Sequence, residues 1–244
     1  MGSDPFGVWR RRRQAGDANA TLIELYRLVA DPRGLAAHEL SREERDALWK
    51  RAAPVIWPGY QVPAGTERSE SEPVEIVQYD SAWASQFQRW RDRLAASLGD
   101  AATRVEHVGS TSVPGLAAKP VVDISITVAD PEQESSYVPP IEALGLQLRS
   151  RDDFHRFFRP FAGRPRDVQV HVSATHSDWE RRHLLFRDYL RAHEDARNAY
   201  LVAKLDAAER WRDDRIAYAD AKTLVINRLM DEAESWAVRT DWTP

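Results

Sequence analysis

Apolar side chains recur at steps of three and four residues along much of the chain, which is the spacing of an amphipathic helix. In the first half, this spacing predicts helices over residues 17–30, 41–54 and 81–98. In the second half it predicts long helices over residues 177–193, 195–212 and 215–238. A shorter helix is expected within 131–145, and the Pro139-Pro140 pair moves its expected start to Pro140.

Shorter segments between these helices are alternating or continuously apolar, which predicts β-strands. The predicted strands cover residues 74–79, 104–108, 121–128, 146–150, 155–161 and 168–174. The segment Gly163–Asp167 is expected to join the last two as a hairpin loop. Strands separated by helices, then a meander, then helices alone, describe an α+β (α/β) domain with a small mixed β-sheet flanked by helices.

The composition along the chain predicts four parts. Residues 1–16 are expected to form a disordered tail, and 17–60 a helical N-terminal extension. Residues 61–73 are polar and contain Pro, Gly and Ser, which is typical of a linker. The main domain is then expected over residues 74–240, ending in a C-terminal helical part.

The totals restrict the class of protein. Of the 244 residues, 43% are hydrophobic, which is enough for a substantial core, and the net charge is −4. Mild acidity argues against nucleic acid as a partner over the whole surface. The lack of cysteine excludes disulfides and thiolate metal sites. No apolar run approaches the length of a membrane span. We therefore expect a soluble, cytoplasmic protein without a membrane partner.

One turn is rich in small residues with polar groups. Gly109 allows the backbone to approach a ligand closely, and Ser110, Thr111 and Ser112 add hydroxyl and N–H groups. This composition predicts contact with an anion such as phosphate. The alternative for Ser110 is an ordinary helix N-cap.

A lysine and an acid follow this turn. Lys119 supplies a mobile positive charge, either to a phosphate or to solvent. Asp123 lies within an apolar run, where an unpaired carboxylate would be expensive to bury, so we expect it at a strand end or in an open cleft. Turn, cation and acid together predict an anion site with a metal ligand.

Further candidates lie downstream. Lys204 and Lys222 fall on the apolar faces of their helices, where a lysine either snorkels to solvent or meets an anion. We expect snorkelling for Lys204 and an anion for Lys222. Arg187 is expected to pair with Asp188, with phosphate contact as the alternative. His171 lies on a polar strand face, which fits a cleft floor or solvent exposure equally.

The stretch from His107 to Asp123, His-Val-Gly-Ser-Thr-Ser-Val-Pro-Gly-Leu-Ala-Ala-Lys-Pro-Val-Val-Asp, resembles the signature of the GrpB (UPF0157) family. Segments downstream also match its pattern: Val170–Val172, Phe186–His193, Tyr200 with Lys204, and Tyr218 with Lys222. The resemblance covers about residues 74–236 and implies a nucleotidyltransferase-like fold. Some actinobacterial dephospho-CoA kinases carry a similar domain, but this sequence has no G-x-x-x-x-G-K-[ST] loop, so no kinase is implied.

The fold resemblance also implies roles. In active nucleotidyltransferases, a Gly-Ser turn binds nucleotide phosphates and three acids hold Mg²⁺. The resemblance implies that Gly109 and Ser110 correspond to this turn. It also implies that Asp123 corresponds to the first acid, both as a catalytic group and as a metal ligand. Ser125 stands at the second acid position, and His171 is the inward residue on the strand of the third. A single acid with a hydroxyl and an imidazole is a weak magnesium site.

The leading interpretation is a GrpB-like protein that binds a nucleotide such as ATP, or another phosphorylated small molecule, with Mg²⁺ or Mn²⁺, and transfers a nucleotidyl group. Lys119, Lys204, Lys222 and Arg187 are the candidate phosphate contacts beyond the turn. The alternative is a non-catalytic ligand-sensing or partner-binding module, with residues 17–60 contacting a protein partner.

Overall fold

The computed structural model describes residues 59, 61–66 and 73–244. The chain divides into two compact units, Met1–Val62 with Ser150–Phe154, and Pro63–Arg149 with His155–Pro244. The tail predicted for 1–16 and the helices predicted within 17–54 lie outside the described residues, so the predicted domain boundaries stay a prediction. The second unit contains the candidate site residues.

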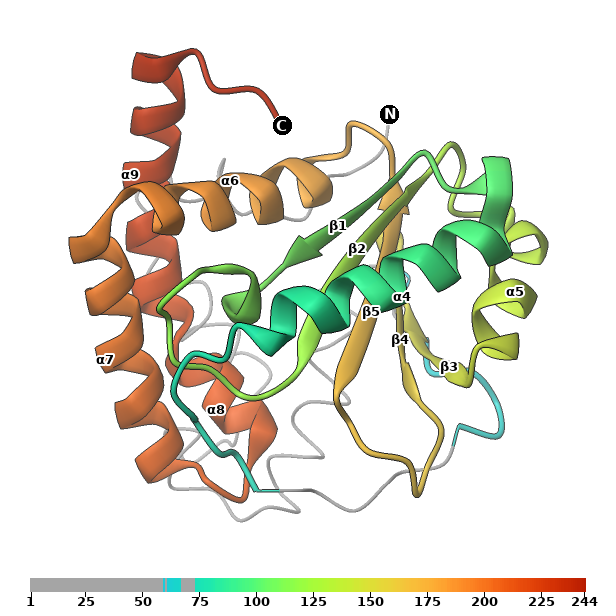
Figure 1. Cartoon of the computed structure of the whole chain (residues 1–244), viewed down its shortest axis with the longest axis horizontal. Coiled ribbons are helices and arrows are strands. Elements are labelled where there is room, and N and C mark those ends of the chain that lie inside the picture. The colour runs from blue at the N-terminus through green and yellow to red at the C-terminus, as the bar shows by residue number, and fades with distance from the viewer. Residues whose placement is uncertain (1–58, 60, 67–72) are drawn as a thin grey trace, which may run out of the picture. The chain divides into compact units, whose positions relative to one another are not determined.

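Five strands form one sheet in the order β1-β2-β5-β4-β3 (Figure 1). Their bounds are β1 (Arg104–Val108), β2 (Val122–Val128), β3 (Leu146–Arg151), β4 (His155–Pro160) and β5 (Val168–Ala174). β2 pairs antiparallel with β1 and parallel with β5, which in turn pairs antiparallel with β4. The expected small mixed sheet of an α+β domain is therefore confirmed.

The strand predicted over 74–79 is wrong. In this segment only Val77 forms a β-bridge, and its partner is Ala118. The N–H of Val74 donates instead to the carbonyl of Arg212, at 2.6 Å. The backbone of this segment thus forms hydrogen bonds with two separate loops. The alternation of apolar and polar residues cannot show whether the bonding partner is a loop or a neighbouring strand.

The described helices are α4 (Ala82–Leu98), α5 (Val138–Ala143), α6 (Asp178–Ala192), α7 (Glu194–Arg210), α8 (Arg215–Ala221) and α9 (Thr223–Thr240). α5 begins two residues before the expected Pro140. The prediction of a single helix over 215–238 is wrong, because the helix is interrupted at Lys222, between α8 and α9. The N–H of Lys222 donates to the carbonyl of Ala219 at 3.3 Å, the tight pattern of a helix end. Lys222 thereby becomes the residue before α9.

The alternation of β2 and β5 separates two faces of the sheet. The apolar face packs against α4 and α5, and its buried side chains include Val122, Ile124, Ile126, Val168, Val170 and Val172 with Phe87, Leu94 and Ile141. Figure 1 shows α4 crossing this face. The other face carries Asp123 and Ser125, which are in register with Gln169 and His171. The candidate site residues therefore lie opposite the main core.

The C-terminal helices form a second core, which confirms the predicted C-terminal helical part. α6 begins after Ser177, whose hydroxyl accepts the N–H of Glu180 at 3.2 Å, a capping interaction. α6, α7 and α9 then bury a shared cluster that includes Leu185, Tyr189, Tyr200, Leu229, Met230 and Ala233. Leu116 lies in the loop between β1 and β2, residues 109–121, which we call the motif loop. It packs into the same cluster, so the motif loop is anchored to these helices.

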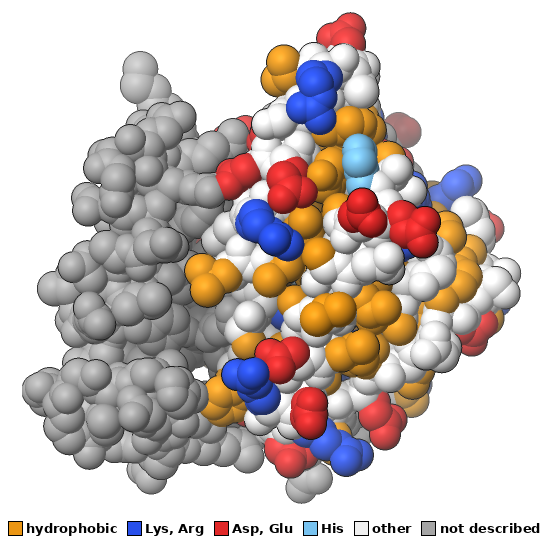
Figure 2. Space-filling model, turned by 90° about the vertical axis from the view of Figure 1, so that its left-hand side faces the viewer, with side chains coloured by type: hydrophobic (Ala, Val, Ile, Leu, Met, Phe, Trp, Pro, Cys, Tyr) orange, Lys and Arg blue, Asp and Glu red, His pale blue; other side chains and the backbone are white. Residues whose placement is uncertain are grey.

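The exposed surface of α7 and α9 is mixed. Val202, Leu205, Leu224 and Val238 are exposed, and hydrophobic side chains lie among acidic and basic ones on this side of the molecule (Figure 2). Scattered apolar side chains are normal on a folded protein. Among the described helices, none combines the length and apolarity that crossing a membrane requires.

Candidate ligand-binding site

The turn after β1 is pressed against Asp123. Gly109 has φ 69° and ψ −171°, a conformation that only glycine adopts readily. A Cβ added to Gly109 would lie 2.9 Å from both Cβ and Cγ of Asp123. The antiparallel pairing of Val108 with Asp123 explains this closeness. Glycine at this position therefore allows both the turn and the approach of the carboxylate.

The three hydroxyls of the turn have different partners. Thr111 Oγ1 donates to the carbonyl of Val121 at 3.1 Å, and Ser112 Oγ donates to the carbonyl of Gly109 at 2.6 Å. Both side chains are buried and maintain the loop. Ser110 is half-buried and lies near Tyr200 of α7, where it opposes the rise that burial causes in the pKa of that tyrosine. The turn also contacts α6, because Arg191 donates to the carbonyl of Ser112 at 2.8 Å. Phosphate contacts by Ser110, Thr111 and Ser112 stay predictions.

Three lysines lie near Asp123. The chain has four lysines among its 34 basic residues, and Lys119, Lys204 and Lys222 all act on this one carboxylate. Burial raises the pKa of Asp123 to about 6, while the three ammonium groups oppose that rise. We call Asp123 with these three residues the lysine cluster.

Lys204 is the buried member of the lysine cluster. Its side chain is 2% exposed, and Nζ donates to the carbonyl of Ala117 at 2.5 Å. The predicted snorkelling to solvent is therefore wrong, because the motif loop supplies a carbonyl acceptor inside the fold. Burial lowers the pKa of Lys204 to about 7; repulsion by Lys222 and Lys119 adds to the shift, and Asp123 opposes it.

Tyrosine rings hold the ammonium groups in place. Lys222 Nζ lies 4.0 Å from the ring centre of Tyr218, and Lys119 Nζ lies 5.3 Å from the same ring. Lys204 Nζ lies 5.2 Å from the ring centre of Tyr200. Cation–π contacts at such distances favour a positively charged ammonium. The tyrosines therefore support the positive charge that Asp123 alone cannot balance.

The residues predicted as metal ligands do not by themselves fit a divalent cation. Asp123 is the one carboxylate of the lysine cluster, and Ser125, two residues along β2, is 2% exposed. Within the described residues, no group of three or more His, Cys, Asp or Glu side chains could hold a metal ion. Mg²⁺ takes oxygen ligands in octahedral geometry. A Mg²⁺ or Mn²⁺ ion at this site stays a prediction.

His171 lies opposite Ser125 in the β2–β5 register, under α6. Its ring centre lies 5.0 Å from that of Phe157 and 5.2 Å from that of Trp179, and Nδ1 is buried without a hydrogen-bond partner. Burial keeps the pKa of His171 well below its usual value. The expected polar strand face is present, and His171 on it is half-buried with the rings of Phe157 and Trp179 beside it, so its use as a cleft floor stays a prediction. Its catalytic role stays a prediction.

Arg187 forms the expected ion pair with Asp188, at 2.7 Å. It also pairs with Glu106 of β1, at 2.7 Å, and donates to the carbonyl of His107 at 3.2 Å. These contacts tie α6 to β1. A phosphate contact by Arg187 stays a prediction.

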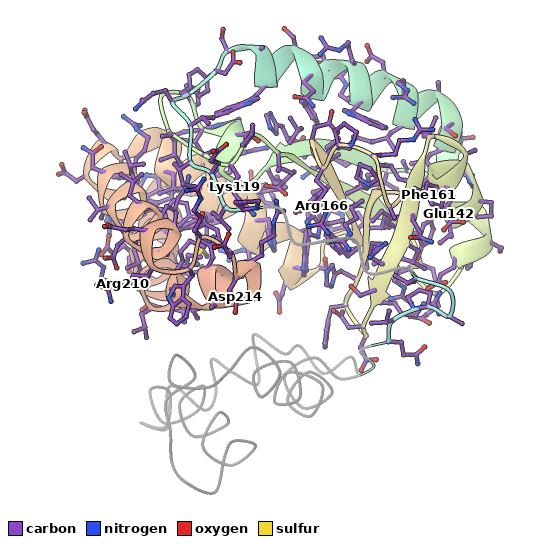
Figure 3. The ribbon with its side chains drawn as sticks, turned by 90° about the horizontal axis from the view of Figure 1, so that it is seen from below. Lys119, Glu142, Phe161, Arg166, Arg210 and Asp214 are labelled. Carbon is purple, nitrogen blue, oxygen red and sulfur yellow. The ribbon has the colours of Figure 1, made fainter. Side chains whose placement is uncertain are left out.

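A cavity of about 320 Å³ adjoins the lysine cluster at Lys119. Its other lining residues are Pro73, Glu75, Pro120, Val121, Arg166 and Arg215. In Figure 3, Lys119 lies between the C-terminal helices and Arg166. Nothing in the sequence distinguishes Arg166 or Arg215, because most of the 34 basic residues are arginines and neither belongs to the motif over residues 107–123.

Comparison with known proteins agrees with this architecture. The family model described as GrpB protein matches residues 73–232. A UPF0157 protein of Halalkalibacterium halodurans is 38% identical over 176 residues, covering 72% of this chain and 90% of the relative. A dephospho-CoA kinase of Mycolicibacterium paratuberculosis is 31% identical over 272 residues, covering 91% of this chain and 67% of the kinase.

Among solved structures, the crystal structure of the conserved protein GrpB from Enterococcus faecalis superposes with a TM-score of 0.59 at 29% identity. The match covers 66% of this chain and 99% of that protein. The region that the family model matches contains the Gly109 turn, the lysine cluster and all five strands. The chain belongs to the GrpB family.

Proposed function

We propose that this protein binds a nucleotide or a nucleotide-containing cofactor through a phosphate group at the lysine cluster. The observation that carries the proposal is that three of the four lysines of the chain, from three separate segments, lie near enough to Asp123 to favour its charged form, and that two of them face the ring of Tyr218. An arrangement that only stabilised the fold would need no such excess of ammonium groups, because like charges held together repel each other.

The charge of the lysine cluster suits a phosphate. Lys204, with a pKa of about 7, is only partly protonated at neutral pH, so Lys119 and Lys222 supply most of the positive charge beside Asp123. A phosphate monoester carries about −1.5 to −2 at neutral pH. A lysine ammonium is a compact point charge on a flexible stem, suited to adjusting around a phosphate. Gly109 adds a turn without a side chain, where a ligand can approach the backbone. The cavity beside Lys119 falls within the range of small-molecule sites, about 300–1,000 Å³.

The reaction that fits this site best is nucleotidyl transfer. Lys119 and Lys222 would neutralise the charge that spreads over the phosphoryl oxygens as the bond to the leaving group lengthens. Tyr218, which both ammonium groups face, would keep them in position. The name of the dephospho-CoA kinase relative makes CoA one of the nucleotide-containing ligands to be tested.

A second candidate function is a non-catalytic ligand sensor. The observation that favours it is the single carboxylate of the lysine cluster, since Ser125 and His171 stand where an active nucleotidyltransferase has its other acids. In that case a bound nucleotide would report to a protein partner, with residues 17–60 as the contacting segment.

The test is isothermal titration calorimetry with ATP, CTP, GTP, UTP and CoA, each with Mg²⁺, with Mn²⁺ and with EDTA. We expect at least one ligand to bind, and Lys222→Gln to weaken it about tenfold or more, since a charge-assisted hydrogen bond contributes about 1.5–3 kcal/mol. Arg210→Gln removes an equal charge from an exposed position on α7 and should leave binding unchanged. Failure of every ligand to bind, or full binding by Lys222→Gln, would refute the assignment.

The two candidate functions differ in turnover. Nucleotidyl transfer is supported if the protein releases pyrophosphate from a bound nucleoside triphosphate, and if this activity is lost in Lys222→Gln and kept in Arg210→Gln. Binding without any pyrophosphate release, over a panel of hydroxyl, amine and carboxylate acceptors, supports the sensor.

A further inference from the structure

Two arginines of α6 hold the turn after β1 at both of its ends. Arg187 donates through Nη1 to the carbonyl of His107 at 3.2 Å, just before the turn. Arg191, one helical turn further along α6, donates through Nε and Nη2 to the carbonyl of Ser112 at 3.0 and 2.8 Å. In the sequence, Gly109 therefore lies between two carbonyl groups that are fixed from the same face of one helix.

Asp188 connects these two arginines. Its carboxylate accepts the Nε–H of Arg187 at 2.7 Å and an Nη1–H of Arg191 at 3.3 Å. Arg187 also pairs with Glu106 of β1 at 2.7 Å. Two guanidinium groups and two carboxylates balance each other, so these side chains bind the turn and one another without an added anion. We call Arg187, Asp188 and Arg191 the α6 clamp.

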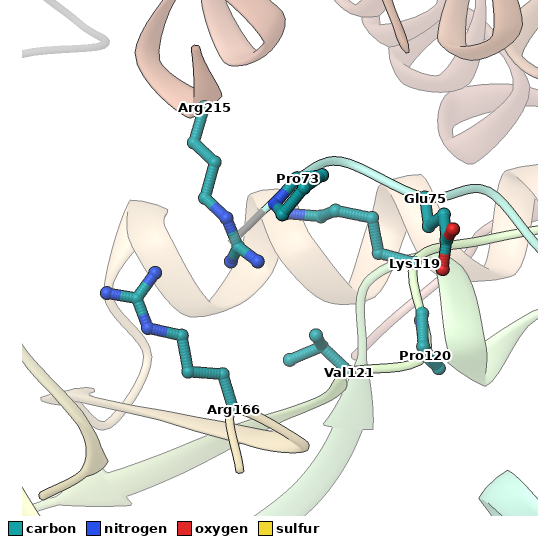
Figure 4. A pocket seen from close by; sticks show the side chains of 7 residues that line it. All are labelled: Pro73, Glu75, Lys119, Pro120, Val121, Arg166 and Arg215. Carbon is teal, nitrogen blue, oxygen red and sulfur yellow. The ribbon is translucent and has the colours of Figure 1, made fainter. Parts of the chain in front are cut away.

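The α6 clamp belongs to a wider pattern along the motif loop. Lys204 of α7 donates to the carbonyl of Ala117 at 2.5 Å, so cationic side chains bind carbonyls at His107, Ser112 and Ala117. Beyond Ala117 the loop continues to Lys119, which lines the cavity beside the lysine cluster (Figure 4). A carbonyl oxygen carries partial negative charge that repels a phosphate, and a cation bonded to the oxygen reduces this repulsion.

Another arginine of α6 shows what a bond between helices looks like here. Arg181 pairs with Glu234 of α9 at 2.6 Å, and its side chain is 35% exposed, against 39% for Arg191. The two arginines thus have similar exposure on the same helix and different neighbours. Arg181 joins α6 to another helix, whereas Arg191 holds the turn of the candidate site.

We infer that Arg191 and Asp188 are positioning residues of the ligand site: Arg191 fixes the carbonyl of Ser112, Asp188 holds Arg191, and together they set the conformation of the turn. The inference rests on the proposed function, because the Gly109 turn is part of the proposed phosphate site. Neither side chain needs to touch the ligand. A binding site must hold its groups within about 0.5 Å of the productive geometry, which requires supporting contacts of this kind.

The experiment measures ligand affinity and stability for the same variants of the full chain. The probes are ATP, CTP, GTP, UTP and CoA with Mg²⁺, by titration calorimetry, and stability is measured by urea unfolding. Arg191→Met should weaken binding about tenfold or more, the scale of one charge-assisted contact, and Asp188→Asn should change it in the same direction. Arg191→Lys keeps the charge and a donor without the planar fork, so it should recover part of the affinity. Arg181→Met is the matched control, which should lower stability and leave affinity unchanged.

A second measurement needs no ligand. Amide hydrogen exchange followed by mass spectrometry reports local opening of the motif loop, residues 109–121. Loss of the bonds to the carbonyl of Ser112 should raise exchange in this loop about tenfold in Arg191→Met, with exchange in α4 unchanged. Arg181→Met should leave exchange in the motif loop as it is in the unmodified protein.

The outcomes separate this inference from the proposed function. If a ligand binds the unmodified protein and Arg191→Met equally, the positioning role is overturned and the proposed function stands. An equal loss of affinity in Arg181→Met also overturns it, because the effect is then one of general stability. If no ligand binds, the proposed function fails and hydrogen exchange decides the role of the α6 clamp. Faster exchange of the motif loop in Arg191→Met than in Arg181→Met supports the clamp, and equal exchange overturns it.

Discussion

The close approach of Gly109 to Asp123 gives the sharpest test of the site geometry. The variant Gly109→Ala keeps φ near 69° only at a cost of about 1–3 kcal/mol, because residues with a Cβ rarely adopt this conformation. The new methyl group would also lie 2.9 Å from Cβ and Cγ of Asp123. Overpacking of this kind costs a further 1–3 kcal/mol or so. We therefore expect a total destabilisation of about 2–6 kcal/mol.

Gly115→Ala is the matched control. Gly115 also has a positive φ, 78°, but no other residue beyond its chain neighbours has an atom within 4 Å of the position of an added Cβ. It should lose only the backbone contribution, about 1–3 kcal/mol. The assay is urea unfolding followed by tryptophan fluorescence, with linear extrapolation to water.

A double-mutant cycle identifies the cause. Asp123→Ala removes Cγ and the carboxylate oxygens, so the Gly109→Ala/Asp123→Ala protein should be more stable than the sum of the single changes predicts, by about 0.5–3 kcal/mol. If Gly109→Ala is no more destabilising than Gly115→Ala, or if its effect simply adds to that of Asp123→Ala, the turn is not pressed against the carboxylate.

Three further predictions concern buried charge. The pKa of Lys204 is about 7 in the folded protein and 10.5 in the unfolded chain, so the unfolded chain binds more protons between these two pH values. The free energy of unfolding should therefore rise from pH 7 to pH 9, and this rise should be smaller in Lys204→Met. Burial lowers the pKa of His183 from 6.5 to about 4, so stability should fall as the pH drops through this window, and less so in His183→Phe. Arg156 is buried and forms an ion pair with Glu134 at 2.8 Å, so Arg156→Met should lower the free energy of unfolding by about 1–3 kcal/mol, measured by urea unfolding. Arg210→Gln, which removes an exposed ion pair with Asp206, should lower it by less than about 1 kcal/mol.

The sequence predicted the secondary structure where the signal is local. The spacing of Trp83, Phe87, Leu94 and Leu98 depends on one helix face, and α4 appears with these side chains buried. The break at Lys222 was missed because the apolar spacing continues across it, from Tyr218 of α8 into α9. What ends α8 is a backbone hydrogen bond that no side chain pattern encodes.

The candidate site was predictable only in part. Gly109 and Asp123 could be predicted from the residues beside them in the sequence, and the pairing of β1 with β2 brings the two together. Convergence of Lys204 and Lys222 on Asp123 depends on how α7 and α9 pack, which is determined by tertiary contacts. No sequence signal distinguishes Arg166 and Arg215, since only the tertiary structure brings them to the cavity beside Lys119.

The position of the lysines along the chain has a consequence for folding. The motif supplies the carboxylate and one ammonium group within a few residues, but Lys204 and Lys222 come from the helical region about eighty or more residues later. Lys204 Nζ donates to the carbonyl of Ala117, inside the motif loop, so docking of α7 both orders that loop and brings the second charge to Asp123. Burial of Asp123 costs free energy until an ammonium group is near. The sheet and the C-terminal helices must therefore be assembled before the site has its full positive charge, and a ligand that binds the lysine cluster should stabilise the packing of α7 and α9 against the motif loop.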